Sequence, residues 1–160
     1  MTIKEQIQLM LDALAAWHKG VGGSVKVAND EPHLFEILGE NPGVPRSAIL
    51  WDEENPRDPL NDDWSGRVDR KFIIAISRGR GFNLKQGDSL MKGVAGGLAM
   101  FELVEQAREI LRALRVTDVP GESVPRYHGS KRLQFQGVTT DAYAITMGLA
   151  AQIPDQVENE

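Results

Sequence analysis

The sequence contains no cysteine among its 160 residues. This absence excludes disulfide bonds, thiolate nucleophiles and metal sites built from thiolates. Long apolar runs are missing too, and none approaches the roughly 20 residues that cross a bilayer as a helix. We therefore expect a protein that is not embedded in a membrane. Residues 1–20 show no signal-peptide pattern, so synthesis and folding in the cytoplasm are expected.

An excess of positive charge is also missing. The formal net charge of -5 argues against nucleic-acid binding by the whole surface, although it leaves room for a local basic patch. A composition with 41% hydrophobic and 26% charged residues is typical of a globular protein. The length suits one domain with a real core. We expect a single domain over residues 1–153 and a disordered acidic tail over residues 154–160.

Catalytic motifs are the third absence. His18, His33 and His128 stand in unrelated contexts, and no nucleophile elbow, zinc-protease helix or paired-carboxylate signature occurs. Residues 78–82 (RGRGF) are similar to a phosphate-binding turn, but Leu84 stands where a dinucleotide motif needs glycine or alanine. The residues therefore predict no catalytic, metal or cofactor site, and a protein that is not an enzyme.

The clearest periodic signal lies in residues 98–115, where apolar side chains recur at helical spacing. Acidic residues come early in this stretch and basic residues late, as the helix dipole favours. A helix with one apolar side must pack on another apolar layer. The buried stripe is expected to comprise Met100, Leu103, Val104, Ala107, Ile110, Leu111 and Leu114.

A second amphipathic helix is expected from Ile3 to the glycines that begin at Gly20. Thr2 is a suitable N-cap, and Glu5 completes a capping-box pattern. His18 lies at the edge of the apolar side. A hydrogen-bonded structural role suits it better than a metal or catalytic role, because no second histidine is near in the sequence.

Two pairs of strands are predicted, and each pair should form an antiparallel hairpin. Residues 46–51 form an apolar run, and residues 67–78 have a β-branched core at residues 72–76 (FIIAI). Residues 131–136 alternate, with Leu133 and Phe135 on one face. Residues 141–152 alternate between larger and smaller side chains, so the small-residue face of this last strand could lie beneath a helix or against another subunit. The expected fold class is α+β, with a small antiparallel sheet of about four strands packed against two amphipathic helices.

Two connecting regions have weaker periodicity. Residues 24–43 are compatible with a brief strand at Val25 and Val27, and with two helical turns over residues 32–38 capped by Asn29 or Asp30. Residues 52–66 combine acidic side chains with proline and glycine, which indicates a solvent-exposed loop. A calcium loop is the alternative, but the spacing lacks the alternating ligands and central glycine of an EF-hand. We therefore expect this loop to be metal-free.

The order helix, strand, acidic loop, strand, long helix, strand, turn, strand resembles the tail terminator or tail completion proteins of long-tailed bacteriophages. The most suggestive stretches are residues 70–76 (RKFIIAI) and residues 133–137 (LQFQG), the latter before the final strand at residues 142–151. The resemblance implies a ring, expected to be hexameric, that caps the tail tube and ends its polymerisation. Its implied partners are further copies of the chain, the tail tube protein and the head-tail connector protein. Its implied location is the virion tail, after assembly in the host bacterial cytoplasm.

Two sets of residues are candidates for contacts in such a ring. Aromatic and arginine side chains are enriched at interface hot spots, so the flank of the long helix is expected to meet the acidic loop of a neighbouring subunit, although Phe101 could instead tuck under the preceding loop. The basic stretch after the second predicted strand is expected to be poorly ordered until it meets a partner, or DNA in the channel. The interface set is Phe101, Arg108, Arg112 and Arg115 with Asp58, Asp62 and Asp63, and the lumenal or partner-binding set is Arg78, Arg80, Lys85 and Lys92.

Other functions fit the same residues. Tail-tube and connector proteins share parts of this layout. A small-ligand-binding or enzymatic α+β domain is an alternative from a different class, and an adaptor or secretion-system component is another.

Overall fold

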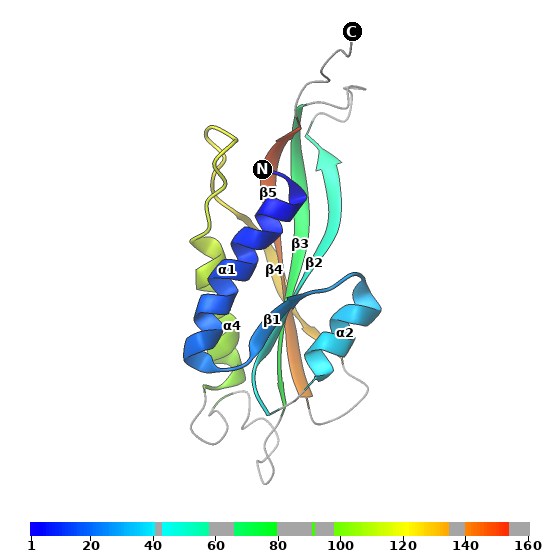
Figure 1. Ribbon diagram of the computed structural model, residues 1–160, viewed down its shortest axis with the longest axis vertical. Helices are drawn as coiled ribbons and strands as arrows, with labels where there is room; N and C mark the ends of the chain where they lie inside the picture. The colour runs from blue at the N-terminus through cyan, green and yellow to red at the C-terminus, as the bar shows by residue number, and fades with distance from the viewer. Residues whose placement is uncertain (41–42, 58–65, 80–90, 92–97, 135–139, 154–160) are drawn as a thin grey trace.

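A twisted five-stranded sheet runs along the long axis of the computed structural model (Figure 1). The structure describes residues 1–40, 43–57, 66–79, 91, 98–134 and 140–153. The strands are β1 (Ser24–Val27), β2 (Arg46–Pro56), β3 (Gly66–Gly79), β4 (Arg126–Leu133) and β5 (Thr140–Ile153). Their order across the sheet is β1-β2-β3-β5-β4. β1 runs parallel to β2, and the other neighbouring strands are antiparallel.

Both predicted hairpins are present. β2 pairs with β3, which places Ile49 opposite Ile74, and β4 pairs with β5, which places Ser130 opposite Ile145. The predicted α+β class is therefore confirmed. The described sheet has a fifth strand, β1, beyond the four expected. It is the brief strand at Val25 and Val27 with which the sequence is compatible, and its four residues give too short an alternation to count it among the expected strands.

Three helices lie in the described part of the chain: α1 (Ile3–Val21), α2 (Glu31–Gly39) and α4 (Met100–Arg112). Thr2 caps α1 as predicted, because its hydroxyl oxygen accepts the amide hydrogen of Glu5 at 3.1 Å. Asp30, rather than Asn29, caps α2 through the amide of His33 at 2.8 Å. The long helix is shorter than the predicted residues 98–115.

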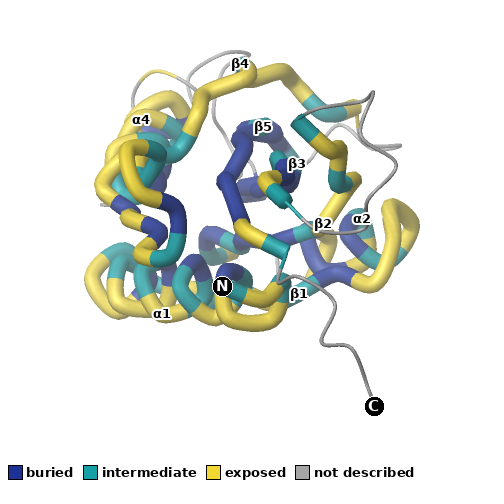
Figure 2. Tube along the Cα trace, turned by 90° about the horizontal axis from the view of Figure 1, so that it is seen from above, coloured by how far each residue is buried: buried dark blue, intermediate teal, exposed yellow. Residues whose placement is uncertain are grey.

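The helices cover the two faces of the sheet unequally. α1 and α4 cover one face, and α2 lies on the other side of the molecule from α4 (Figures 1 and 2). The larger core lies under α1 and α4. It includes Met10 and Leu14 of α1, Phe72, Ile74 and Ile76 of β3, Ile145 and Leu149 of β5, and Met100, Leu103, Ala107 and Leu111 of α4. Most of the predicted stripe is thus buried, and Val104 and Ile110 are partly buried.

A smaller core lies between α2 and the opposite face of the sheet. Leu34, Ile37 and Leu38 of α2 pack there against alanine side chains of three strands. Small residues let the helix approach the sheet closely, so shape complementarity is reached with little side-chain volume. Ala142, on the small-residue face of β5, belongs to this cluster and lies beneath a helix. The alanines of the strands are Ala48, Ala75 and Ala142.

The predicted acidic loop over residues 52–66 is wrong in its first third. Residues 52–56 continue β2, and a register shift after Trp51 places Glu53 opposite Lys71. Acidic side chains are tolerated in this strand because the neighbouring strand supplies cations, and opposite charges across a ladder are favourable. The Lys71 ammonium lies 3.6 Å from Asp52 and 3.7 Å from Glu53.

Candidate functional site

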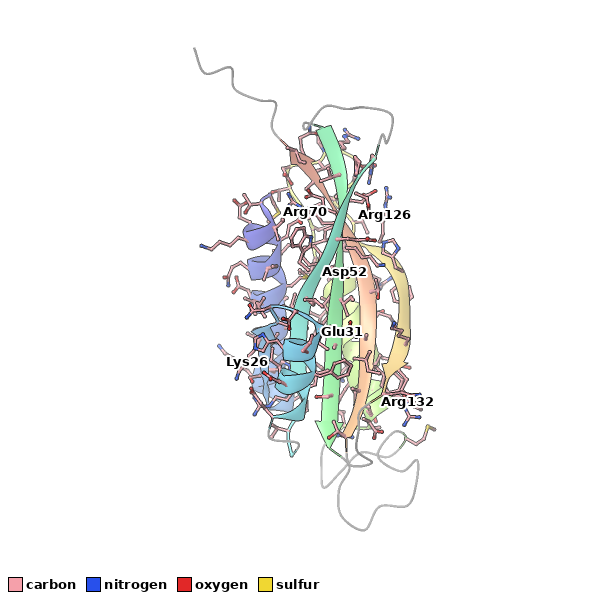
Figure 3. All side chains as sticks on the ribbon, turned by 90° about the vertical axis from the view of Figure 1, so that its right-hand side faces the viewer. Lys26, Glu31, Asp52, Arg70, Arg126 and Arg132 are labelled. Atoms are coloured by element: carbon pink, nitrogen blue, oxygen red, sulfur yellow. The ribbon has the colours of Figure 1, made fainter. Side chains whose placement is uncertain are left out.

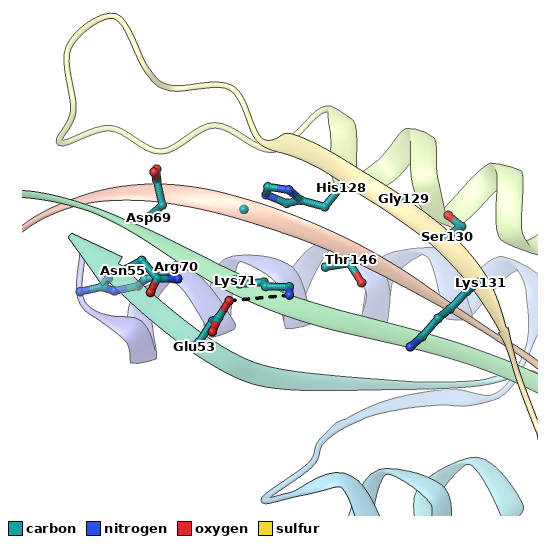
Figure 4. A pocket seen from close by; sticks show the side chains of 11 residues that line it. Glu53, Asn55, Asp69, Arg70, Lys71, His128, Gly129, Ser130, Lys131 and Thr146 are labelled. Atoms are coloured by element: carbon teal, nitrogen blue, oxygen red, sulfur yellow. Dashed lines mark ion pairs between the residues drawn. The ribbon is translucent and has the colours of Figure 1, made fainter. Parts of the chain in front are cut away.

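An open groove of about 610 Å³ lies over the β2, β3, β5 and β4 strands (Figure 4). We call it the open-face groove. Polar side chains from these four strands line it. Arg70, which is among the lining residues, lies beyond the end of α2 along the sheet (Figure 3). The lining includes Glu53, Asn55, Asp69, Lys71, His128, Ser130, Lys131 and Thr146.

The charges of the open-face groove largely neutralise one another. Lys71 is shared between Asp52 and Glu53, as described above. Asp69 accepts two hydrogen bonds at one oxygen from the Arg57 guanidinium, at 2.9 and 3.1 Å, and Arg126 approaches its other oxygen at 3.6 Å. Arg57 also pairs with Glu122, which ties the segment after α4 to this end of the sheet. This network is therefore suited to holding the strands together.

His128 is the only histidine that lines the open-face groove. Its ring lies across Gly148, where an added Cβ atom would stand 2.7 Å from the ring nitrogen Nε2. Within the described residues, no hydrogen bond orients this ring towards a nucleophile or a carboxylate. A general base needs such an orienting partner and a reachable proton. The open-face groove therefore lacks the geometry of an acid–base centre among the described residues.

A second groove, of about 290 Å³, lies between α4 and β4, and we call it the α4–β4 groove. Leu111, Ile145, Met147 and Pro125 contribute its apolar lining. Its polar lining is Arg108, Glu109 and Arg112 of α4, and Arg126 and Tyr127 of β4. This groove combines apolar, aromatic and arginine side chains, which is the composition enriched at the centres of protein interfaces.

The strand that borders the α4–β4 groove is an edge strand. β4 stands at the end of the strand order and contains no acidic residue. Tyr127 is 56% exposed, and its hydroxyl group lies 2.7 Å from that of Ser130. A register shift between Tyr127 and Gly129 interrupts the ladder, and Gly129 has a φ of 126°, which favours glycine. This β-bulge therefore interrupts the regular pairing of β4 with β5 next to the exposed Tyr127.

The structure separates the predicted interface residues of the long helix. Arg108 and Arg112 line the α4–β4 groove together, as residues four apart on a helix should. Phe101 is 39% exposed and meets the ring of Tyr143 edge-on, with 5.9 Å between ring centroids. Arg115 instead donates to the carbonyl oxygens of Arg112 and Leu114, at 2.8 and 2.7 Å. Arg115 therefore satisfies carbonyl groups at the C-terminal end of α4 and just after it.

The prediction that Arg78 belongs to a poorly ordered loop is wrong. Arg78 lies in β3, is 5% exposed and stands opposite Asp141 of β5. Its guanidinium donates to the carbonyl oxygen of Leu98. Burial lowers the pKa of Arg78, and the carboxylates of Asp141 and Glu102 oppose that effect. The other predicted loop and acidic residues lie outside the described residues: Arg80, Lys85, Lys92, Asp58, Asp62 and Asp63.

Sequence reasoning missed Arg126 and Tyr127 as parts of a site. They follow a segment rich in proline and glycine, and the predicted strand began only at Lys131. The run of aromatic and basic residues in β4 (RYHGSKRL) was the available signal. The position of β4 beside α4 depends on the pairing of β4 with β5, and no local sequence pattern predicts that pairing.

Comparison with models of known protein families gave no match, and comparison with curated proteins gave no significant match. Among the described residues, no group of three or more histidine, aspartate or glutamate side chains is placed to hold a metal ion. None of the helices in the described ranges has the length and apolar character needed to cross a membrane.

Proposed function

We propose that this protein is a structural component of a bacteriophage tail. It assembles into a ring, expected to be hexameric, that ends polymerisation of the tail tube and joins the tube to the head connector. The proposal rests first on the sequence resemblance. The order on which that resemblance depends is a helix, two strands, a long helix and two strands. The elements α1, β2, β3, α4, β4 and β5 follow this order, with β1 and α2 inserted between α1 and β2.

The α4–β4 groove is the observation that carries the proposal. A ring protein needs a surface that recognises another subunit, and it needs no reaction centre. The groove offers an apolar floor, two arginines on one wall, and Arg126 with the exposed Tyr127 on the other. Tyrosine and arginine are the residue types that most often dominate binding energy at interfaces. In this proposal the protein acts through contacts and is not an enzyme.

Replacement of Arg108 and Arg112 by glutamate tests this function. The double variant should fail to form rings or to cap tail tubes, as measured by sedimentation and electron microscopy. Its stability should stay within about 0.5 kcal/mol of the wild type, because Arg112 is exposed, Arg108 is half-buried without an ion pair to a described residue, and charge changes at the surface usually cost little. The matched control replaces the exposed Lys4 and Lys19 of α1 by glutamate, with the same change in charge. Normal assembly of the groove variant would contradict the proposal.

Small-ligand binding in the open-face groove is the second candidate function. Its volume falls within the range of about 300–1,000 Å³ that is common for ligand sites. A bound ligand would raise the melting temperature by mass action. Inorganic phosphate and short dicarboxylates are suitable probes, because Lys131 and His128 are exposed along one side. His128→Ala and Lys131→Ala should then abolish the rise, whereas no rise with any probe would argue against this function.

A further inference from the structure

The α4–β4 groove is positively charged as well as apolar. Arg108 makes no ion pair with any described residue. Glu109, the one acidic residue in the lining, is paired with Arg112 at 2.8 Å. Arg112 remains highly exposed, with 73% of its side chain open to solvent. A partner that fills this groove should therefore present an apolar ridge flanked by carboxylates.

The outer side of α2 has that composition. Glu31, Pro32 and Glu36 are exposed, and Phe35 is partly buried. On a helical wheel these four positions form one continuous outward stripe, in which two apolar side chains lie between two carboxylates. Neither Glu31 nor Glu36 forms an ion pair with the described part of the chain. Glu40 at the end of α2 is already paired with Lys26 at 2.8 Å, and this contact lowers the pKa of Glu40.

The positions of the two surfaces exclude a contact within one chain. α2 and α4 lie on opposite sides of the molecule in two perpendicular views (Figures 1 and 2). A contact between the stripe on α2 and the groove must therefore join two copies. Because the two surfaces differ, the contact is head-to-tail, and repetition of a head-to-tail contact yields a ring when its rotation closes.

We propose that the outward stripe of α2 in one copy docks into the α4–β4 groove of the next copy. Glu31 and Glu36 face Arg108 and Arg112, while the exposed Pro32 contacts the apolar floor. This inference rests on the proposed ring-forming function and names its subunit contact. It names a different partner for the arginines from the expected Asp58, Asp62 and Asp63, which lie outside the described residues.

Reciprocal charge reversal tests the docking. The groove variant carries Arg108→Glu and Arg112→Glu, and the helix variant carries Glu31→Arg and Glu36→Arg. Each variant alone should stay monomeric, because its two surfaces then have the same charge. An equimolar mixture should assemble, because each groove meets an oppositely charged α2 of the other variant. The alternating ring requires an even number of subunits, which a hexamer satisfies.

The outcomes separate this inference from the proposed function. If the helix variant assembled like the wild type while the groove variant did not assemble, the docking of α2 would be overturned and the proposed ring function would still stand. A mixture that stays monomeric would also overturn the docking. Wild-type particles that are open filaments, as seen by electron microscopy, would overturn the ring function and leave the head-to-tail contact standing. A wild-type chain that never self-associates would overturn both.

Disulfide trapping gives an answer that does not depend on the reversed charges. The chain has no cysteine, so any cross-link reports introduced residues alone. Pro32→Cys on α2 and Glu109→Cys in the lining of the α4–β4 groove are both at exposed positions. The doubly substituted chain should give a ladder of covalent oligomers on oxidation, and each single variant should give none. Efficient dimers of the Pro32→Cys variant alone would indicate a two-fold contact and overturn the inference.

Discussion

His18 of α1 and Ser47 of β2 share a buried hydrogen bond, with 2.7 Å between the ring nitrogen Nε2 and the hydroxyl oxygen. The other ring nitrogen, Nδ1, lies 2.8 Å from the carbonyl oxygen of Gly22. A carbonyl oxygen only accepts, so Nδ1 carries the proton and Nε2 accepts from the serine hydroxyl. Both nitrogens of a neutral ring are thus satisfied. The structural role predicted for His18 is confirmed.

Stability should therefore decrease as the solution becomes acidic. Burial lowers the pKa of His18 below 6.5, and the nearby Arg46 lowers it further, although the Gly22 carbonyl opposes the shift. The unfolded chain then binds a proton at a higher pH than the folded chain does. The contribution of His18 is complete above the unfolded pKa and is lost as the pH falls through it towards the folded pKa.

Urea unfolding at about pH 7.5 and about pH 5 measures this effect. The free energy of unfolding of the wild type should be smaller at the lower pH. His18→Gln removes the titrating ring and should reduce the difference between the two pH values. Equal differences for the wild type and the variant would contradict the prediction.

Gly23 joins α1 to β1 and has a φ of 82°, a conformation that favours glycine. An added Cβ atom would stand 1.6 Å from the carbonyl oxygen of Pro45, so the backbone before β2 would have to move. Gly23→Ala should destabilise the protein by at least about 2 kcal/mol, because a strained backbone and a steric clash combine.

Gly20 provides the matched control for Gly23. It lies in the last turn of α1, and an added Cβ atom would have no neighbour within 4 Å. Gly20→Ala should raise stability by about 0.5–1 kcal/mol, since alanine loses less conformational freedom in a helix than glycine does. Thermal and urea unfolding compare the two variants. Similar effects of both substitutions would refute the geometric account.

Tyr127 should contribute to assembly and little to folding. Tyr127→Ala removes an exposed ring from the wall of the α4–β4 groove, and its melting temperature should stay close to that of the wild type. The same variant should weaken self-association by about tenfold or more, as truncation of an interface anchor commonly does. Sedimentation at several concentrations gives the association constant.

Tyr127→Phe separates the ring of Tyr127 from its hydroxyl group. It keeps the aromatic surface and loses only the hydrogen bond to Ser130. Assembly near the wild-type level is expected for this variant. If phenylalanine weakened assembly as much as alanine did, the hydroxyl group and not the aromatic surface would carry the contact.

Local patterns in the sequence determined much of the fold. The cap at Thr2, the existence of the long amphipathic helix and the two hairpins were all predictable, because each depends on neighbouring residues or on a short period. The buried stripe of α4 followed from spacing alone. So did the shared position of Arg108 and Arg112, since four residues make about one helical turn.

Only the tertiary structure decided where the charged side chains lie. Asp52 continues a strand because Lys71 of the neighbouring strand lies close to it, and Arg78 is buried opposite Asp141 of β5. Tyr127 borders a groove with α4 because β4 pairs with β5 at the far edge of the sheet. These relations join residues distant in the chain. The free energy of a charge depends on such neighbours and on its burial, and neither is encoded in a local pattern.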